Sequence, residues 1–319
     1  MNKMIAAACC ACCVFGTASA QNYPTKAVRI VVPYPAGGTS DILSRLLSPK
    51  LNDALGQPIV VDNRPGANGN LGADLVAKSA PDGHTMLLAD LGALTISPSI
   101  YKLPFDVVKD FAPVTMVSYS PHLLAVHPSV PVKTVKELVA LAKTKPGRLN
   151  FAVSGIGGAP HLAGVAFEAQ TGVKWTYIPY KGGSDAIVGL ASGQADAIFN
   201  GMLATYPYVR SGKLKLLAVS SAKRVAAIPD VPTVAEAGLP GFETGSWQGV
   251  VAAAGTPKEI VARLNTEIIK ALSTAEMKEN LGKQGTEVYT MTPEQLSTWL
   301  KTEIDKWSKV VKAANLKLE

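Results

Sequence analysis

Two glycine-rich segments constrain this chain more than any other feature of its sequence. The first is Pro-Tyr-Pro-Ala-Gly-Gly-Thr-Ser-Asp at positions 33–41, and the second is Ser-Gly-Ile-Gly-Gly-Ala-Pro-His at positions 154–161. Each follows a short apolar run typical of a strand and precedes a stretch with helical periodicity. Such a turn leaves backbone N–H groups free at the positive end of a helix dipole, which makes an anion site without a cationic side chain. Either turn alone is also typical of an ordinary α/β protein, but the pair predicts two lobes that hold one acidic ligand.

The first 20 residues have the pattern of an export signal. Lys3 supplies the charge, positions 5–15 an apolar stretch, and positions 18–20 a small-residue cleavage site. All four cysteines of the chain lie in this segment, so the exported protein is predicted to have no disulfide, thiol nucleophile or cysteine-bound metal. Lipid attachment is the alternative, but Cys9 comes too early to follow a full apolar region. We therefore predict cleavage near Ala20-Gln21 and a periplasmic location.

The composition is that of a well-cored globular protein. Hydrophobic residues make up 47% of the chain and charged residues 17%, which excludes a disordered protein. Without Lys3 the net charge is about +6. The basic residues are scattered, and neither an arginine-rich run nor an aromatic–basic platform is present. We therefore predict no nucleic-acid partner, whereas a positive exported protein attracts anionic solutes.

Strands and helices are expected to alternate along the whole chain. The predicted strands are 28–32, 59–61, 86–89, 150–153, 175–178, 195–199 and 214–219. The predicted helices are one capped by Thr39 or Ser40, then 71–80, 135–143, 162–170, 184–192, 257–272, 275–284 and 293–314. Extended runs at 114–117, 123–126 and 247–253 are expected to cross between two lobes. These predict a first lobe of 21–117 and 249–319, a second lobe of 118–248, and a hinge of crossing strands.

Seven motifs in a fixed order connect the chain to a known family. Besides the turn at 33–41 they are Asn-Arg-Pro-Gly-Ala-Asn-Gly-Asn-Leu-Gly-Ala at 63–73, Pro-Asp-Gly-His-Thr at 81–85, His-Leu-Ala-Gly at 161–164, Pro-Tyr-Lys-Gly at 179–182, Gly-Gln-Ala-Asp at 193–196 and Pro-Asp-Val-Pro-Thr-Val-Ala-Glu-Ala-Gly at 229–238. Over essentially the whole exported chain, the sequence resembles the substrate-binding proteins of tripartite tricarboxylate transporters, also called the Bug family of solute receptors. The resemblance implies an α/β, two-lobed periplasmic binding protein of type II with a Venus-flytrap cleft. It also implies that the backbone of the two glycine loops holds a small carboxylate, which is passed to membrane permease subunits.

The residues expected to bind the ligand come from these two loops and from the ends of three strands. The candidates are Tyr34, Ala36, Gly37, Gly38, Thr39, Ser40, Asp41, Asp90, Ser154, Gly155, Gly157, Gly158, Ala159, His161, Tyr180 and Asn200. The second loop departs from the family, which is richer in Ser or Thr there, because only Ser154 offers a hydroxyl. Asp90 also departs, because small or neutral residues are common at its position.

Several of these side chains have a second interpretation. Asp90 either faces an amino or hydroxyl group of the ligand or caps a helix. If it faces the ligand, a fully anionic polycarboxylate is disfavoured. His161 either donates to the ligand or a bound water, or fixes its own loop by bonding a carbonyl. Asp41 favours the helix dipole and can also hold a bridging water. Lys181 is the best cationic candidate near the cleft, although it is also typical of a solvated cap and ranks below Tyr180.

Other functional classes have little support in the sequence. The third glycine of a G-x-G-x-x-G fingerprint would fall at Pro160, no G-x-S-x-G elbow exists, and the four histidines lack metal-ligand spacing. We therefore predict no cofactor, no metal and a monomeric receptor rather than an enzyme. A sensor subunit that presents the same closed form to a signalling partner is the main alternative, and an exported enzyme acting on a small acid is a weaker one. Amino acids, aliphatic di- and tricarboxylates and aromatic acids all remain open as ligands.

Overall fold

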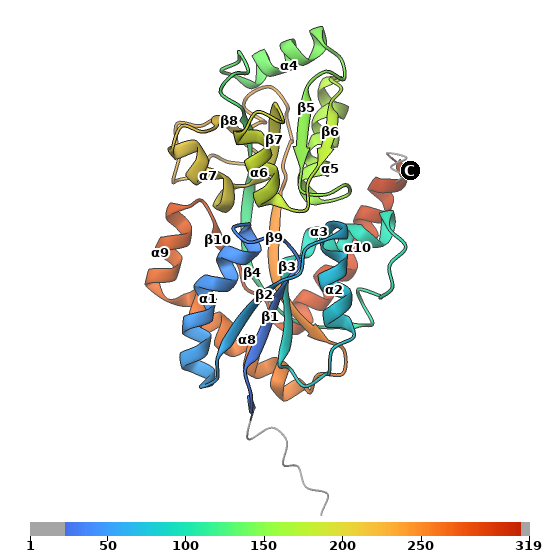
Figure 1. Cartoon of the computed structure of the whole chain (residues 1–319), viewed down its shortest axis with the longest axis vertical. Helices are drawn as coiled ribbons and strands as arrows, with labels where there is room; N and C mark the ends of the chain where they lie inside the picture. The colour runs from blue at the N-terminus through green and yellow to red at the C-terminus, as the bar shows by residue number, and fades with distance from the viewer. Residues whose placement is uncertain (1–22, 314–319) are drawn as a thin grey trace, which may run out of the picture.

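The computed structural model describes residues 23–313, so the predicted export signal and its cysteines lie outside the described residues. Two lobes follow one another along the long axis of the molecule (Figure 1). The strands are β1 (Val28–Val32), β2 (Ile59–Asn63), β3 (Thr85–Asp90), β4 (Phe111–Val126), β5 (Asn150–Val153), β6 (Thr176–Pro179), β7 (Ala197–Gly201), β8 (Lys215–Val219), β9 (Gly245–Ala253) and β10 (Glu287–Val288). The helices are α1 (Thr39–Leu55), the short 3-10 helix η1 (Ala67–Gly69), α2 (Asn70–Ala77), α3 (Leu91–Ile100), α4 (Val135–Thr144), α5 (Ala159–Thr171), α6 (Gly183–Ala191), α7 (Met202–Arg210), α8 (Lys258–Ser273), α9 (Ala275–Lys283) and α10 (Pro293–Ala313). None of the helices within 23–313 is long and apolar enough to cross a membrane.

Two long strands, β4 and β9, run from one lobe into the other (Figure 1). The strands are ordered β2-β1-β3-β9-β4-β7-β5-β6, with β8 and β10 also paired to β4. Pairing is parallel inside each lobe, for β1 with β2 and β3 and for β5 with β6 and β7. It is antiparallel wherever β4 or β9 takes part. The crossing strands therefore connect two parallel α/β units, as expected for the hinge.

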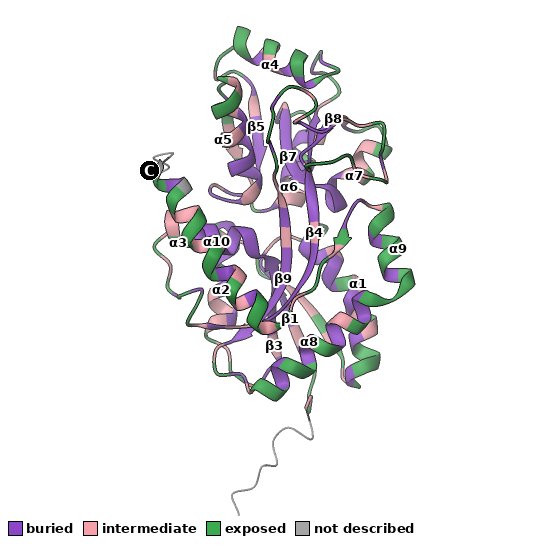
Figure 2. Ribbon diagram, turned by 180° about the vertical axis from the view of Figure 1, so that it is seen from behind, coloured by how far each residue is buried: buried purple, intermediate pink, exposed green. Residues whose placement is uncertain are grey.

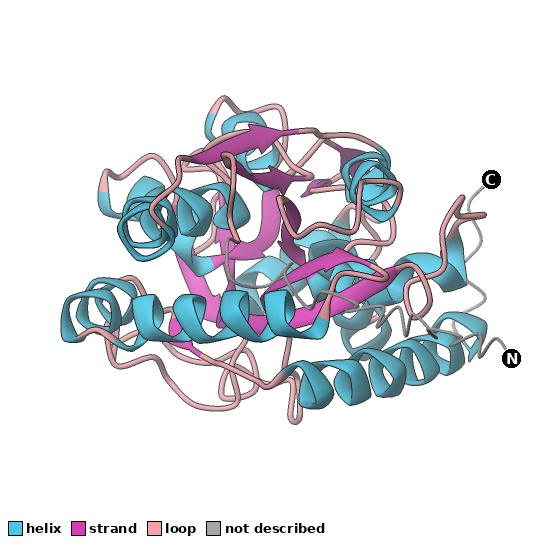
Figure 3. Cartoon of the chain, turned by 90° about the horizontal axis from the view of Figure 1, so that it is seen from below, coloured by secondary structure: helices cyan, strands magenta, loops and turns pink. Residues whose placement is uncertain are grey.

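Each lobe has a hydrophobic core on both faces of its strands. In the first lobe, one cluster lies under α1 and α8 around Leu47 and Leu264, and the other lies under α3 and α10 around Leu91 and Leu296. The second lobe repeats this plan with separate clusters on the two faces of β5 and β7. Figure 2 shows the strands buried along most of their length, and Figure 3 shows helices flanking them on both sides. The predicted α/β, two-lobed fold is confirmed.

The structure differs from the predicted elements at several places, and the short strand β10 was not predicted. The runs at 114–117 and 123–126 belong to the single strand β4. Helices α3 and α7 were not predicted, because each begins directly at the end of a strand and contains an internal proline, Pro98 or Pro207. The predicted cap of α1 by Thr39 or Ser40 is wrong, since the N-cap residue is Gly38 and no side chain caps the helix.

Candidate ligand-binding site

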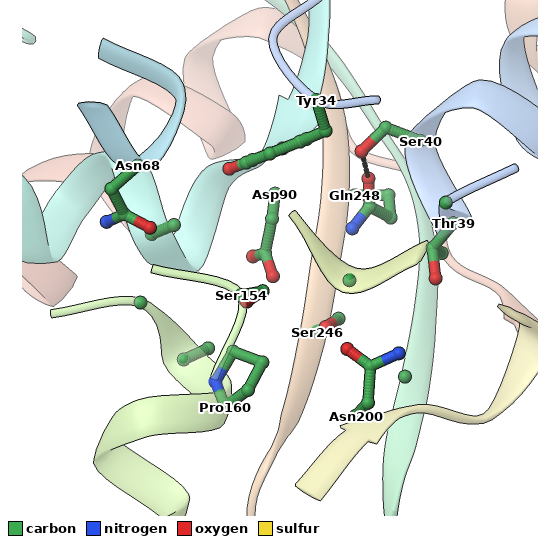
Figure 4. Close-up of a pocket in the computed structure, with 16 residues that line it drawn as sticks. Tyr34, Thr39, Ser40, Asn68, Asp90, Ser154, Pro160, Asn200, Ser246 and Gln248 are labelled. Carbon is green, nitrogen blue, oxygen red and sulfur yellow. Dashed lines mark hydrogen bonds between the residues drawn. The ribbon is translucent and has the colours of Figure 1, made fainter. Parts of the chain in front are cut away.

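A cavity lies between the two lobes, beside the crossing strand β9 (Figure 4). Its volume is about 50 Å³ when counted over positions that the centre of a water molecule can reach, several times what one ordered water needs. The residues that line it are Tyr34, Gly38, Thr39, Ser40, Asn68, Asp90, Ala93, Ser154, Gly158, Ala159, Pro160, Gly183, Asn200, Gly201, Ser246 and Gln248. Among these lining residues none is Lys, Arg or His, and Asp90 is the one charged side chain.

Five helices begin at the wall of this cavity. The N-cap residues of α1, α5 and α7 are Gly38, Gly158 and Gly201, and α6 begins at the lining residue Gly183. None of these four helices has a side-chain cap, so the N–H groups of their first turns lack intrahelical partners. The fifth helix, α3, is capped by Asp90. Because each N-terminus carries a partial positive charge, the cavity favours an anion although no cationic side chain lines it.

The two glycine loops have nearly the same backbone geometry. Both N-cap glycines are extended, with φ and ψ of −80° and 168° at Gly38 and of −76° and 164° at Gly158. Each follows a left-handed glycine, Gly37 at φ 81° and Gly157 at φ 78°. This conformation needs glycine. The two turns therefore aim their following helices at the same space from opposite lobes.

A side chain four residues along the chain locks each left-handed glycine. Asp41 Oδ2 accepts a hydrogen bond from Gly37 N–H at 2.9 Å, and His161 Nδ1 accepts one from Gly157 N–H at 3.1 Å. His161 also packs edge-on against Tyr177, with 4.6 Å between ring centroids. Of the two interpretations of His161, the structure supports loop fixation, although the partner is an N–H group rather than a carbonyl. Burial lowers the pKa of His161 to about 4, which keeps the ring neutral and able to accept.

Asp41 is the centre of a small polar network behind the first loop. Besides Gly37 it accepts hydrogen bonds from Arg45 Nε at 3.0 Å and Asn63 Nδ2 at 3.1 Å. Burial alone raises the pKa of Asp41, but the hydrogen bonds from Arg45, Gly37 and Asn63 outweigh burial and hold the pKa below its ordinary value. Asn63 also donates to the Tyr34 carbonyl at 3.0 Å. Asp41 therefore holds the loop and lies outside the lining of the cavity.

Asp90 ends β3 and both caps α3 and lines the cavity. Its Oδ1 accepts from Gly92 N–H at 2.9 Å. Burial raises the pKa of Asp90 to about 6, in spite of opposing hydrogen bonds from Ser246 and from the backbone of Gly92, Ala93 and Trp247. No cation contributes to this pKa. The cavity therefore contains a buried carboxyl group without a positive partner in the described part of the chain.

A histidine on β4 contacts two hydroxyl side chains at the start of β9, one of which, Ser246, also reaches Asp90. His122 on β4 places Nε2 3.3 Å from Ser246 Oγ and Nδ1 3.0 Å from Thr244 Oγ1. A serine beside a histidine suggests a nucleophile with a general base. Here, however, burial lowers the pKa of His122 to about 3, and its second nitrogen meets a hydroxyl group instead of a carboxylate. A base this weak is poorly matched to proton abstraction at neutral pH.

The lobes touch each other around the rim of the cavity. Asn68 of the first lobe lies so close to the second glycine loop that a Cβ on Gly158 would be 2.9 Å from its Oδ1. On the other side, a Cβ on Gly201 would be 2.9 Å from Thr39 Oγ1. Tyr101 Oη donates to the carbonyl of Ile156 across the same gap. The structure is therefore a closed arrangement.

The structure brings together part of the predicted set. Tyr34, Gly38, Thr39, Ser40, Asp90, Ser154, Gly158, Ala159 and Asn200 line the cavity. Ala36, Gly37, Gly155 and Gly157 in the loops, and Asp41 and His161 in the first turns of α1 and α5, lie outside the lining. Tyr180 lies with Lys181 in a separate depression between the lobes. Sequence reasoning missed Asn68, Ala93, Pro160, Gly183, Gly201, Ser246 and Gln248. A signal for two of them was present, because Ser246 and Gln248 are polar residues in an otherwise apolar crossing strand.

A cavity between two α/β lobes that touch at its rim, joined by two crossing strands and lined by helix N-termini, defines a solute-binding protein of the periplasmic type. Residues 43–316 match the model of the tripartite tricarboxylate transporter family receptor. The chain belongs to this family, as its motifs predicted.

Relatives of known name and structure agree with this assignment. The chain is 38% identical to Protein BugT of Bordetella pertussis over 94% of this chain and 93% of that protein. A protein of R. palustris solved with adipate is 37% identical, with a TM-score of 0.90, and the match covers 93% of this chain and all of that one. MatC from Rhodopseudomonas palustris, solved with bound malate, is 34% identical with a TM-score of 0.86 over 91% of this chain and all of that one.

Proposed function

We propose that this protein is a periplasmic receptor that captures a small carboxylate in the cavity between its lobes. The observation that carries the proposal is the convergence of five helix N-termini, four of them uncapped, on a cavity without Lys, Arg or His. An anion there satisfies N–H groups that are otherwise unpartnered. The adipate and malate in the two R. palustris proteins support the same ligand class for this chain.

The donors come mainly from the two glycine loops. At the start of α1 they are the backbone N–H groups of Gly38, Thr39 and Ser40, and at the start of α5 that of Ala159, while Ser154 adds a hydroxyl group. Gly37, Gly157, Asp41 and His161 fix the loops that present these donors. Because donors from both lobes meet one ligand, binding favours the closed arrangement.

We extend the proposal to ligand delivery, oligomeric state, lobe bounds and export. The closed form delivers its ligand to the permease subunits of a tripartite transporter, and the receptor acts as a monomer without cofactor or catalysis. The first lobe comprises 21–117 and 249–319 and the second 118–248, with bending in β4 and β9. An export signal cleaved near Ala20-Gln21 precedes them.

A thermal-shift screen of the protein without residues 1–20 tests the ligand class. The panel is a set of small organic acids, each paired with its neutral amide, after any co-purified ligand has been removed. An acid present at about 100 times its Kd stabilises the folded state by about 2.7 kcal/mol, which raises Tm clearly. Stabilisation by acids and not by their amides supports the proposal, whereas no response to any acid contradicts it.

A matched pair of glycine variants tests whether ligand binding requires the two lobes to close. A Cβ on Gly158 would meet Asn68 of the opposite lobe at 2.9 Å, whereas a Cβ on Gly282 of α9, outside the cavity lining, would meet nothing within 4 Å. Gly158→Ala should therefore weaken acid binding about tenfold or more, and Gly282→Ala should change it little. Equal affinities for both variants would contradict closure around the ligand.

A further inference from the structure

The cavity holds hydrogen-bond acceptors as well as donors, and this combination restricts the chemical class of ligand that fits it. Asp90 and Asn200 point into the space that Ser154 and Ser246 border (Figure 4). Asp90 is 7% exposed and Asn200 is 4% exposed, so water does not solvate either group freely. Asp90 already accepts hydrogen bonds from the protein, so a ligand that offers only negative oxygens would leave Asn200 Oδ1 without a donor and would set its own charge beside the carboxylate of Asp90, which is costly in a buried site.

The orientation of the Asn200 amide is determined by its neighbours on α7. Asn200 Nδ2 donates to Thr205 Oγ1 at 3.1 Å, and the hydroxyl of Thr205 donates in turn to the Gly201 carbonyl at 2.9 Å. Because that hydroxyl proton is already used, Thr205 can only accept from Asn200. The amide nitrogen must therefore face Thr205, and the carbonyl oxygen Oδ1 faces the cavity.

Asp90 caps α3 and accepts hydrogen bonds from Ser246 and the backbone, but no cationic side chain of the described residues pairs with its charge. No cation lowers its pKa, and burial raises it, yet a pKa of about 6 still leaves the group mostly ionised at neutral pH. Tyr34, the other titratable group that lines the cavity, has its pKa raised by burial and by Asp90, so it stays neutral. A cationic group on the ligand would supply the missing partner, and charge-assisted hydrogen bonds are the stronger kind.

We propose that the ligand is a carboxylate that also carries a protonated amine, and that Asp90 and Asn200 Oδ1 receive this ammonium group while the helix N-termini receive the carboxylate. This inference rests on the proposed receptor function and specifies its substrate class as amino acids. Asp90 then determines specificity: it binds the ammonium group and rejects acids whose second group is also anionic.

Calorimetric titration with matched acids tests the substrate class. Each set shares one carbon skeleton and differs in one substituent, which is an amine, a hydroxyl or a hydrogen. L-Aspartate, L-malate and succinate form one such set, and L-alanine, L-lactate and propionate form another. The skeletons have three to six carbons. On the skeleton that binds best, the amino acid should bind at least about tenfold more tightly than its hydroxy and unsubstituted counterparts. Tightest binding by a hydroxy or unsubstituted acid overturns this inference but leaves the carboxylate receptor intact. Binding of no acid overturns the receptor proposal itself.

Asp90→Asn tests the role of the charge without removing the helix cap, because Asn caps as well as Asp does. The variant should lose at least about tenfold in affinity for the amino acid, and it should bind the unsubstituted acid of the same skeleton at least as tightly as the unaltered protein does, because the repelling charge is gone. Asp53→Asn, an exposed residue on α1, makes the same charge change away from the cavity and should alter neither affinity. A parallel loss for both acids, or no loss for the amino acid, overturns the assignment. The Tm of the ligand-free variant shows whether it is folded.

Discussion

The two glycine loops have the same backbone but are locked by chemically different side chains. At equivalent positions a left-handed glycine, an extended N-cap glycine and a locking residue occur in both, and the locking residue is Asp41 in one and His161 in the other. The carboxylate of Asp41 acts within a network that includes Arg45 and Asn63. The imidazole of His161 accepts one hydrogen bond and packs on Tyr177.

The difference teaches that the shape of the turn, rather than its side chains, is what the two lobes share. A carboxylate and a neutral imidazole both place an acceptor two bonds beyond Cβ, so each reaches the N–H group four residues back. The charge of Asp41 requires partners, which the first lobe supplies. The second loop needs no partners but requires that His161 stay unprotonated.

The largest expected effect comes from removing Asp41, the side chain that fixes Gly37 in the first loop. Asp41→Ala removes a buried carboxylate and its three hydrogen bonds from Gly37, Arg45 and Asn63. At about 1 kcal/mol for each of these bonds, we expect a loss of about 3 kcal/mol in the free energy of unfolding, measured by urea denaturation.

Two controls accompany this variant. Asp41→Asn keeps an oxygen that can accept from Gly37 and should lose less. Asp53→Ala, on the exposed side of the same helix, should change stability within about 0.5 kcal/mol. Equal losses for Asp41→Ala and Asp53→Ala would show that the network does not hold the loop.

The next largest effect is a pH dependence of the free energy of unfolding, and it comes from the second loop alone. The pKa of His161 is about 4 in the folded protein and about 6.5 in the unfolded chain, so the unfolded state binds more protons between these values. Its contribution to stability is present above pH 6.5 and is lost as pH falls, by about 2 kcal/mol between pH 7 and pH 5. The pKa of Asp41 lies below 3.8, so the first lock persists through this range.

His161→Asn isolates this contribution. The Oδ1 atom of Asn can accept from Gly157 without titrating, so the variant should lose less stability than the unaltered protein between pH 7 and pH 5. His122 and Asp90, whose pKa values are also shifted, are common to both proteins and cancel in the comparison. Identical pH profiles would contradict the role of His161.

Local chemistry explains why the loops could be predicted from the sequence. A strand, a glycine turn and an amphipathic helix are contiguous, so Gly38 and Gly158 could be placed at helix N-termini from sequence alone. Helix α3 could not be placed, because its residues are buried almost all round and burial on every side removes the period that marks a helix.

The missed part of the site depends on contacts that are remote in sequence. Gln248 reaches the cavity because β9 pairs with β3 in a register that sets it opposite Asp90, and its Oε1 accepts from Ser40 at 2.6 Å. Asn68 reaches it through a left-handed backbone, φ 56°. Neither the pairing of distant strands nor a left-handed Asn has a periodic signal.

A smaller difference is expected between alanine variants of the two left-handed glycines, in how much each weakens ligand binding. Alanine costs about 1 kcal/mol at either position, because both have positive φ. A Cβ on Gly157 would also lie 2.7 Å from Ile100 Cδ1 on α3 in the other lobe, whereas a Cβ on Gly37 meets nothing closer than 3.9 Å. Gly157→Ala should therefore cost up to about 1 kcal/mol more than Gly37→Ala in ligand binding. Equal binding losses in calorimetry would place the strain within the loops and not between the lobes.

The smallest effect concerns the second residue of α1 and of α5, where one helix has a backbone N–H group and the other has none. Ser40 and Pro160 are equivalent in the two turns, and proline has no N–H to offer. Pro160→Ala gives α5 a further N–H group facing the cavity, which should favour an anion by less than about 1 kcal/mol. Loss of the proline ring weakens contacts with any ligand, so the informative quantity is the ratio of affinities for an acid and its amide. That ratio should rise two- to fivefold, and an unchanged ratio would mean that the second loop binds the carboxylate through donors other than the first turn of α5.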